Sequence, residues 1–236
     1  MSLTRDLTRP LTRDLTRDLT GIGTTRYLTE LPGVASHYFN MPALTLPGNW
    51  RVAAEFSTGT SQSNNCIFGY NHSTAIMINL QSTDRFQVLL SGTTYNTATG
   101  VGALDSELHL LEAALVGTTL TLGLDGVEIL NETGVTSYTS AMPDIRIGSI
   151  NSISAPFQGI VSEAKIYSEG SIVSYYKIDQ SWAGGSTQLY DYSGNDNHGT
   201  AVGVTDANAE KFTLNTETTP DQWENSDKSV IIPIAY

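Results

Sequence analysis

From about residue 27 to residue 212, apolar residues alternate with polar or small residues in one short run after another. Trp50, Val52 and Phe56 belong to one such run, and further runs lie at 76–80, 86–90, 120–130, 145–150, 159–167 and 171–178. A period of two places successive side chains on opposite faces of an extended strand, so each run predicts a half-buried β-strand. Strands that follow one another without recurrent helical segments favour antiparallel sheets packed face to face.

Local turn chemistry supports this interpretation. Asp125-Gly126 stands between two alternating apolar runs, and a two-residue Asp-Gly connection is typical of a β-hairpin with a type I′ turn. One segment stays ambiguous, because the apolar run within residues 104–116 is too short to separate a helix from a buried strand.

Composition limits the partners of this sandwich. With 236 residues, 39% of them hydrophobic, the chain is long enough for one large β domain over residues 27–212. The formal net charge of −12 disfavours nucleic acid and anionic membrane as main partners, because both require a cationic surface. Residues 1–26 differ from the rest, since they hold five of the 12 Lys and Arg but only three of the 24 Asp and Glu.

The N-terminal segment 1–26 contains a four-residue repeat of leucine, threonine and arginine. Its leucines and arginines are Leu3, Arg5, Leu7, Arg9, Leu11, Arg13, Leu15, Arg17 and Leu19. A period of four drifts around a helix, and Pro10 interrupts helical hydrogen bonding, whereas an extended chain would place every Leu and Arg on one side. Such a ribbon has no core of its own. It is either a flexible leader or, as the regularity favours, an arm that orders on a partner or on sister subunits.

The C-terminal segment 213–236 is polar at first and ends in an apolar, strand-like run at residues 229–236. An exposed apolar strand invites pairing with another chain, so we expect this extension to pack on the sandwich or on a neighbouring subunit. Together with the arm, it predicts a homo-oligomer, and we expect a trimer in which three arms meet on the symmetry axis.

Two segments resemble the concanavalin A-like or laminin-G-like jelly-roll superfamily. Residues 157–167 (FQGIVSEAKIY) are similar to a strand pair of that family, and residues 175–179 (YYKID) with 189–200 (LYDYSGNDNHGT) are similar to its second motif. The resemblance implies an all-β, two-sheet antiparallel jelly-roll sandwich, here with an extended N-terminal repeat arm.

The order of the family's motifs along this chain differs from the usual order, and the difference indicates the kind of protein to which the domain belongs. In most laminin-G-like domains the Asp-x-Ser-Gly-Asn segment opens the domain, whereas here it closes the domain, as in the permuted form found in tailed-bacteriophage structural proteins. The resemblance therefore implies a virion decoration, fibre or attachment protein, bound through its arm to capsid or tail proteins and contacting host-surface glycans. The N-terminal residues carry no continuous apolar run, so we expect synthesis in the host cytoplasm without a signal peptide. The alternative is a free carbohydrate-binding lectin module of bacterial origin.

Catalytic chemistry is not predicted. Glycoside hydrolysis needs two carboxylates flanking the scissile bond, and in the nearest pattern Glu107 and Glu112 would face opposite sides of a strand. The single cysteine, Cys66, falls in a predicted buried strand, and none of the four histidines forms a metal-like pair. An endoglycanase or lyase is the weakest hypothesis, and we expect no enzyme and no cofactor.

Two kinds of binding site are considered, a calcium site and a sugar site. Calcium-binding relatives make Ca²⁺ conceivable at the oxygen-rich residues Asp191, Ser193, Asn195, Asp196 and Asn197, but a turn capped by Asp191 and Asn195, with Gly194 and Gly199 at positive φ, is favoured. Sugar binding needs aromatic faces beside amides, and such residues occur in two predicted loops. These possible glycan contacts are Tyr70, Asn71, His72, Tyr95 and Asn96.

Overall fold

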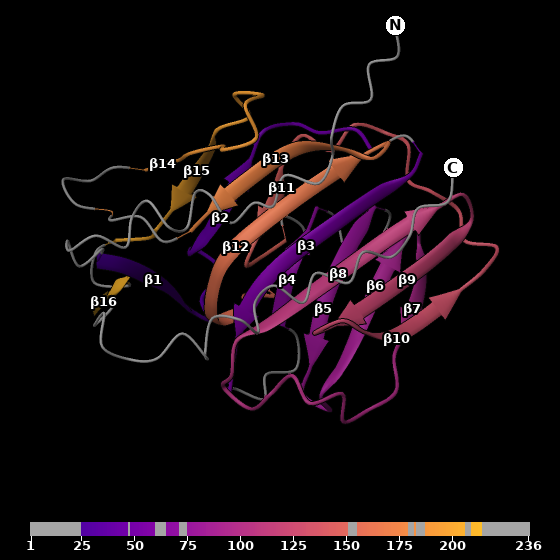
Figure 1. The fold of residues 1–236 in the computed structure, drawn as a ribbon, viewed down its shortest axis with the longest axis horizontal. Helices are drawn as coiled ribbons and strands as arrows, with labels where there is room; N and C mark the ends of the chain where they lie inside the picture. Colours follow the sequence, from indigo (N-terminus) through magenta and orange to yellow (C-terminus); the bar gives the residue numbers. More distant parts are fainter. Residues whose placement is uncertain are drawn as a thin grey trace, which may run out of the picture.

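The computed structural model describes residues 25–46, 48–59, 65–70, 75–150, 155–178, 182, 187–205 and 209–213. These residues form two antiparallel sheets that pack face to face, and none of them is helical (Figure 1). The predicted jelly-roll sandwich is therefore confirmed. The arm leucines and arginines, Leu3 to Leu19, and the extension 214–236 lie outside the described residues. No helix among the described residues is long and apolar enough to cross a membrane.

The first sheet has the order β10-β9-β8-β3-β12-β1-β16, with β13 paired to β12 as well. Its strands are β1 (Thr25–Pro32), β3 (Trp50–Ser57), β8 (His109–Val116), β9 (Thr119–Leu124), β10 (Val127–Glu132), β12 (Gln158–Ser168), β13 (Ser171–Lys177) and β16 (Ala209–Thr213). The long strand β12 pairs with β3 along one edge. On its other edge it pairs with β1 near its start and with β13 near its end.

The second sheet has the order β14-β15-β2-β11-β4-β5-β6-β7. Its strands are β2 (Tyr38–Met41), β4 (Asn65–Gly69), β5 (Ile76–Gln81), β6 (Arg85–Leu90), β7 (Thr93–Asn96), β11 (Ile145–Ile147), β14 (Gln188–Leu189) and β15 (Gly199–Val202). Strand β7 ends this sheet, as β10 ends the first. Both edges are short and largely polar, which limits pairing with other chains.

The main core lies between the sheets and follows the period-two pattern. Val52, Phe56 and Leu122 point inward from the first sheet and meet Phe68 and Val88 from the second. Burying such side chains contributes roughly 1.5–3 kcal/mol each, which stabilises the sandwich without any disulfide.

Trp182 belongs to the same core, although it follows β13 as a single described residue. Its ring lies 5.6 Å from that of Phe39, and its Nε1–H donates a 2.9 Å hydrogen bond to Thr29 Oγ1 on β1. A buried indole needs a partner for its polar edge, and Thr29 supplies it.

A second, smaller cluster lies on the opposite face of the second sheet. Cys66, Met77 and Leu89 occupy alternate positions of β4, β5 and β6, and Ile150 with Ala155 covers them. Cys66 is fully buried, so its predicted core position is confirmed, and burial raises the pKa of its thiol far above the ordinary range.

Two local predictions are settled by the structure. The ambiguous segment becomes strand β8, whose Leu111, Ala113 and Leu115 face the core at a period of two. The turn at Asp125 and Gly126 has φ values of 49° and 81°, so both central residues adopt the left-handed conformation that a type I′ hairpin requires.

Candidate functional site

The Asp191 turn, residues 190–198, binds directly to β13. Asp191 pairs antiparallel with Tyr176 and points inward beside it, and the Tyr176 hydroxyl donates to the Asn197 carbonyl at 2.6 Å. Burial raises the pKa of Tyr176 to about 12, so this phenol stays a donor. The turn is thereby fixed to the end of the first sheet.

Each oxygen of the Asp191 carboxylate accepts hydrogen bonds from two donors. Oδ1 accepts from the backbone N–H of Tyr175 at 2.8 Å and of Ser193 at 2.9 Å. Oδ2 accepts from the Ser193 hydroxyl at 2.7 Å and from the Asn197 N–H at 2.9 Å. Burial raises the pKa of Asp191, but these donors outweigh burial and hold the pKa below its ordinary value.

This geometry does not fit a calcium ion. A cation would need the lone pairs of Asp191 that already accept N–H and O–H groups, and the side-chain amides of Asn195 and Asn197 donate to backbone carbonyls of β13. Among the described residues, no three His, Cys, Asp or Glu side chains gather as metal ligands. The oxygen-rich segment is a hydrogen-bonded turn.

Two details of the predicted turn are wrong. The Asn195 side chain does not form the predicted Asx-type bond to the backbone of its own turn; its amide donates to the Ile172 and Val173 carbonyls of β13, at 3.0 and 3.2 Å, and to the Ser193 hydroxyl at 3.1 Å. Gly194 has the expected positive φ of 87°, but Gly199 is not among the residues of positive φ. Gly199 is needed for close packing, because a Cβ there would lie 2.7 Å from the Asn40 carbonyl oxygen.

The residues on either side of Asp191 form a different kind of surface. Alternation points Tyr190 and Tyr192 away from the core, and they are 46% and 52% exposed. The Tyr192 N–H donates to the Tyr175 carbonyl at 2.7 Å, and the two rings lie 6.1 Å apart. The ring of Tyr190 packs edge-on against His198 at 5.7 Å. We call this surface, with its charged neighbours, the tyrosine face: Tyr175, Tyr190, Tyr192, Glu163, Lys165 and Lys177.

Charged groups surround the central ring of the tyrosine face. The Tyr175 hydroxyl donates to Glu163 at 2.9 Å, and Glu163 also pairs with Lys165. The ammonium groups of Lys165 and Lys177 lie 4.7 and 5.7 Å from the centre of the Tyr175 ring. Aromatic rings, a carboxylate and ammonium groups are the groups that stack on and hydrogen-bond to a sugar.

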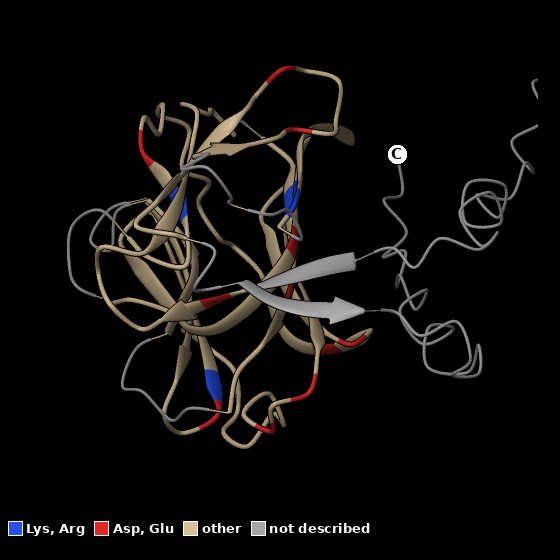
Figure 2. Cartoon of the chain, turned by 90° about the vertical axis from the view of Figure 1, so that its left-hand side faces the viewer, with Lys and Arg blue, Asp and Glu red and all other residues tan. Residues whose placement is uncertain are grey.

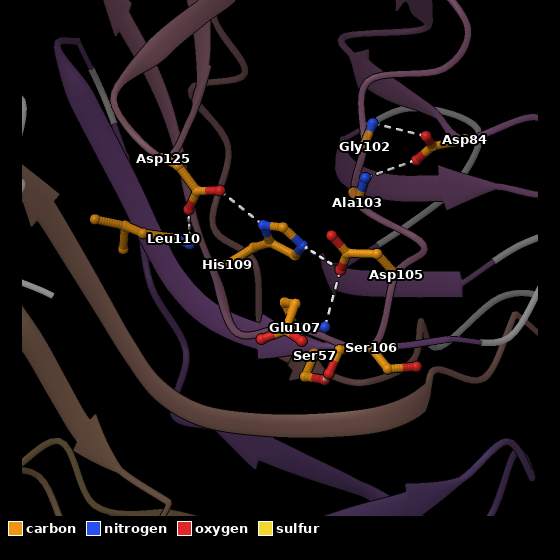
Figure 3. A network of polar contacts seen from close by, with 10 residues as sticks. All are labelled: Ser57, Asp84, Gly102, Ala103, Asp105, Ser106, Glu107, His109, Leu110 and Asp125. Carbon is orange, nitrogen blue, oxygen red and sulfur yellow. Dashed lines mark hydrogen bonds and ion pairs between the residues drawn. The ribbon is translucent and has the colours of Figure 1, made fainter. Parts of the chain in front are cut away.

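A second polar network lies at the start of β8 (Figure 3). We call it the His109 clamp, and it consists of His109, Asp105 and Asp125. The His109 ring is buried, and its Nε2 lies 2.8 Å from Asp105 Oδ1 while its Nδ1 lies 2.7 Å from Asp125 Oδ2. Asp125 also accepts from the Leu110 N–H at 2.8 Å, and Asp105 from the Glu107 N–H at 2.8 Å. The clamp thus ties the loop before β8 to the β9–β10 turn.

The His109 clamp has a structural role. Burial lowers the pKa of His109, but the hydrogen bonds that its ring donates to the Asp125 and Asp105 carboxylates outweigh burial and leave the pKa raised. A neutral imidazole could donate to only one carboxylate, whereas the imidazolium donates to both. Both ring nitrogens are engaged, so neither is available as a general base in this conformation.

Asp84 secures the same loop from the second sheet. Its carboxylate accepts from the N–H groups of Gly102 and Ala103 at 2.7 and 2.9 Å (Figure 3). The loop before β8 is therefore held at two points by carboxylates.

The possible glycan contacts are not brought together. Tyr95 and Asn96 belong to strand β7 rather than to a loop, and Tyr70 directly follows β4, with β5 and β6 between the two strands. Tyr70 and Tyr95 are half-buried against the main core, which leaves little ring area for a ligand. Asn71 and His72 lie outside the described residues. The two candidate contacts therefore lie apart in the second sheet, and a glycan site at either one stays a prediction.

The sequence analysis predicts only a structural role for the tyrosines of the tyrosine face. Tyr190-Asp191-Tyr192 was interpreted as part of a structural motif, and Tyr175 as part of a strand. The available signal was alternation: once Asp191 faces inward, Tyr190 and Tyr192 must face outward.

Comparison with known proteins supports the fold. A putative carbohydrate-binding protein from Bacteroides ovatus matches with a TM-score of 0.63 and 17% identity over 82% of this chain, and the match spans 61% of that protein. Domain 4 of the arabinanase AbnA from Geobacillus stearothermophilus, solved with arabinotriose, matches with a TM-score of 0.50 and 18% identity, over 64% of this chain and 78% of that domain. Domains LG4–5 of the mouse laminin α1 chain reach a TM-score of 0.46 and 16% identity, over 61% and 41%.

No family model and no curated protein matches the sequence. At these identities the structural likenesses establish the jelly-roll fold alone.

Proposed function

We propose that this chain is a non-catalytic glycan-binding module whose binding surface is the tyrosine face. The observation that carries the proposal is the outward display of Tyr190 and Tyr192, of which Tyr192 lies beside Tyr175 and its charged neighbours. Two large aromatic side chains left about half exposed lose hydrophobic stabilisation that burial would supply. A pyranose ring stacked on them would bury that area, and Lys and Glu would bind its hydroxyl groups.

Support also comes from the printed description of a structural neighbour as a putative carbohydrate-binding protein, and from the arabinotriose bound to another. These neighbours motivate the class of ligand to be tested, while the tyrosine face names the residues.

The proposal is tested by measuring glycan binding of the wild type and of a Tyr190→Ala, Tyr192→Ala double variant on a glycan array and by calorimetry. We expect the double variant to remain folded and to lose affinity at least tenfold, or about 1.4 kcal/mol. Val127→Ala removes another exposed apolar side chain, on the distant strand β10, and should leave binding unchanged. Unchanged binding by the double variant, or loss of binding on Tyr95→Ala alone, would contradict the proposal.

One pair of carboxylates does lie close together. The structure places Glu55 and Glu163 opposite each other on β3 and β12, a pairing across strands that the spacing within a single strand does not reveal. Each carboxylate already has a partner, because Glu55 accepts from the Ser162 hydroxyl and Glu163 pairs with Lys165 and the Tyr175 hydroxyl. Glycoside hydrolysis needs two carboxyl groups that face the scissile bond, and these two are engaged by neighbouring side chains within the sheet.

We further propose that the module is displayed on a virion, with the repeat arm as its anchor to capsid or tail proteins and a trimer as its assembly. The sequence features behind this proposal are the four-residue Leu repeat and the closing position of the Asp191 motif. A free bacterial lectin is the alternative. Deleting residues 1–20 should leave a folded, glycan-binding protein that no longer enters particles. Normal incorporation of the truncated protein would contradict the anchor role.

A further inference from the structure

Lys and Arg are few in the part of the chain that the structure describes, and Asp and Glu outnumber them (Figure 2). The Lys and Arg side chains that the structure describes are Arg51, Arg85, Arg146, Lys165 and Lys177. Arg51, Lys165 and Lys177 lie on the neighbouring strands β3, β12 and β13, with their side chains on the outer face of the first sheet. In a chain of net charge −12, most cations with described side chains therefore gather on one face.

Most of these cations already have polar partners. Arg51 pairs with Glu112 at 3.4 Å, Arg146 with Asp144 at 2.7 Å, and Lys165 with Glu163. Arg85 donates to the amide oxygen of Gln81 at 2.8 Å.

Lys177 differs from the other four. Within the described part of the chain it forms no ion pair, and its ammonium group instead lies 5.4 Å from the ring centre of Tyr192 and 5.7 Å from that of Tyr175. The half-buried side chain places a positive charge between the aromatic rings of the tyrosine face.

We propose that the tyrosine face selects acidic glycans, and that Lys177 receives the carboxylate of the sugar. This inference rests on the proposed glycan-binding function and names its ligand class. A neutral sugar stacked on Tyr192 would cover the ammonium group without supplying an acceptor of opposite charge, whereas a carboxylated sugar would pair with it.

Lys165 is less available to a ligand than Lys177. Lys165 is held by Glu163, which also accepts the hydroxyl of Tyr175, so this ion pair keeps the central ring in place. Lys177 is the cation whose charge is left for a ligand. It is a specificity-determining residue, and the aromatic rings supply binding that acidic and neutral sugars share.

The experiment uses the full chain and matched pairs of oligosaccharides that differ only in a carboxylate, such as oligogalacturonate and its carboxyl-reduced form. We expect the wild type to bind the acidic member at least tenfold more tightly, and added salt of about 0.5 M to remove most of that preference. Lys177→Met should abolish the preference while retaining neutral binding, and Lys177→Arg should restore it.

The outcomes separate the two proposals. Equal wild-type affinity for both members of each pair, or a preference that survives Lys177→Met, would overturn the selectivity while leaving glycan binding intact. Failure of the wild type to bind either member would overturn the proposed function itself. A melting temperature for each variant confirms that the sandwich is folded.

Discussion

The Asp191 turn and the His109 clamp both attach a loop to the first sheet through carboxylates, but they use different donors. Asp191 accepts hydrogen bonds from three backbone N–H groups and one hydroxyl, none of which titrates in the ordinary pH range. Asp105 and Asp125 accept from a histidine that does titrate. The carboxylate bonds of the first network therefore persist at any pH that leaves Asp191 ionised, whereas the second network also loses strength when His109 loses its proton.

The largest effect should come from Asp191→Asn. The substitution preserves size but replaces one acceptor oxygen by an NH₂ group that faces N–H donors, leaving buried backbone donors without partners. We expect a loss of about 2–3 kcal/mol in the free energy of unfolding, measured by denaturant titration. The matched control is Asp196→Asn, at an exposed position of the same turn where φ is 56° and asparagine is also tolerated. Equal effects of the two substitutions would show that the carboxylate of Asp191 is not what holds the turn.

A smaller and pH-dependent effect should come from His109→Gln. Because Asp105 and Asp125 are 51% and 48% exposed at their side chains, solvent screens the pairing, and we expect a loss of only about 1 kcal/mol at pH 5.5. The pKa of His109 is raised, so its contribution is complete below the ordinary histidine value of about 6.5 and is lost as pH rises through the folded-state pKa. The difference between wild type and variant should therefore shrink by pH 8 or above.

The acidic side of the same pH profile has the opposite sign. A backbone hydrogen bond from Glu107 and the bond from His109 lower the pKa of Asp105, so the contribution of Asp105 is present above its ordinary value and lost as pH falls through the folded-state pKa. Thermal melts of wild type and His109→Gln between about pH 3 and 9 measure the stability difference in both its acidic and its alkaline range. A difference that is constant across this range would contradict an imidazolium clamp.

Both regions also show where sequence reasoning stopped. Asp191 was predicted to cap a turn because Asp, Ser, Asn and Gly close together favour local hydrogen bonds, and that prediction needed no tertiary contact. The His109 clamp joins the start of strand β8 to the loop before it and to the β9–β10 turn. Asp125 was identified only as a hairpin residue, since its second role depends on how β8 and β9 pair.

The sequence by itself determined the strand pattern and the Asp125-Gly126 hairpin, because these follow from a period of two and from local backbone preferences, whereas the burial of Cys66 was implied by the resemblance to the jelly-roll family. It did not determine the choice of helix or strand for residues 104–116, because a short apolar run fits either until neighbouring strands offer it hydrogen bonds. The tyrosine face was likewise decided by the tertiary structure. Tyr175 and Tyr192 are 17 positions apart, and they became neighbours only because the inward turn of Asp191 onto Tyr176 placed the alternate residues of both segments on one outer surface.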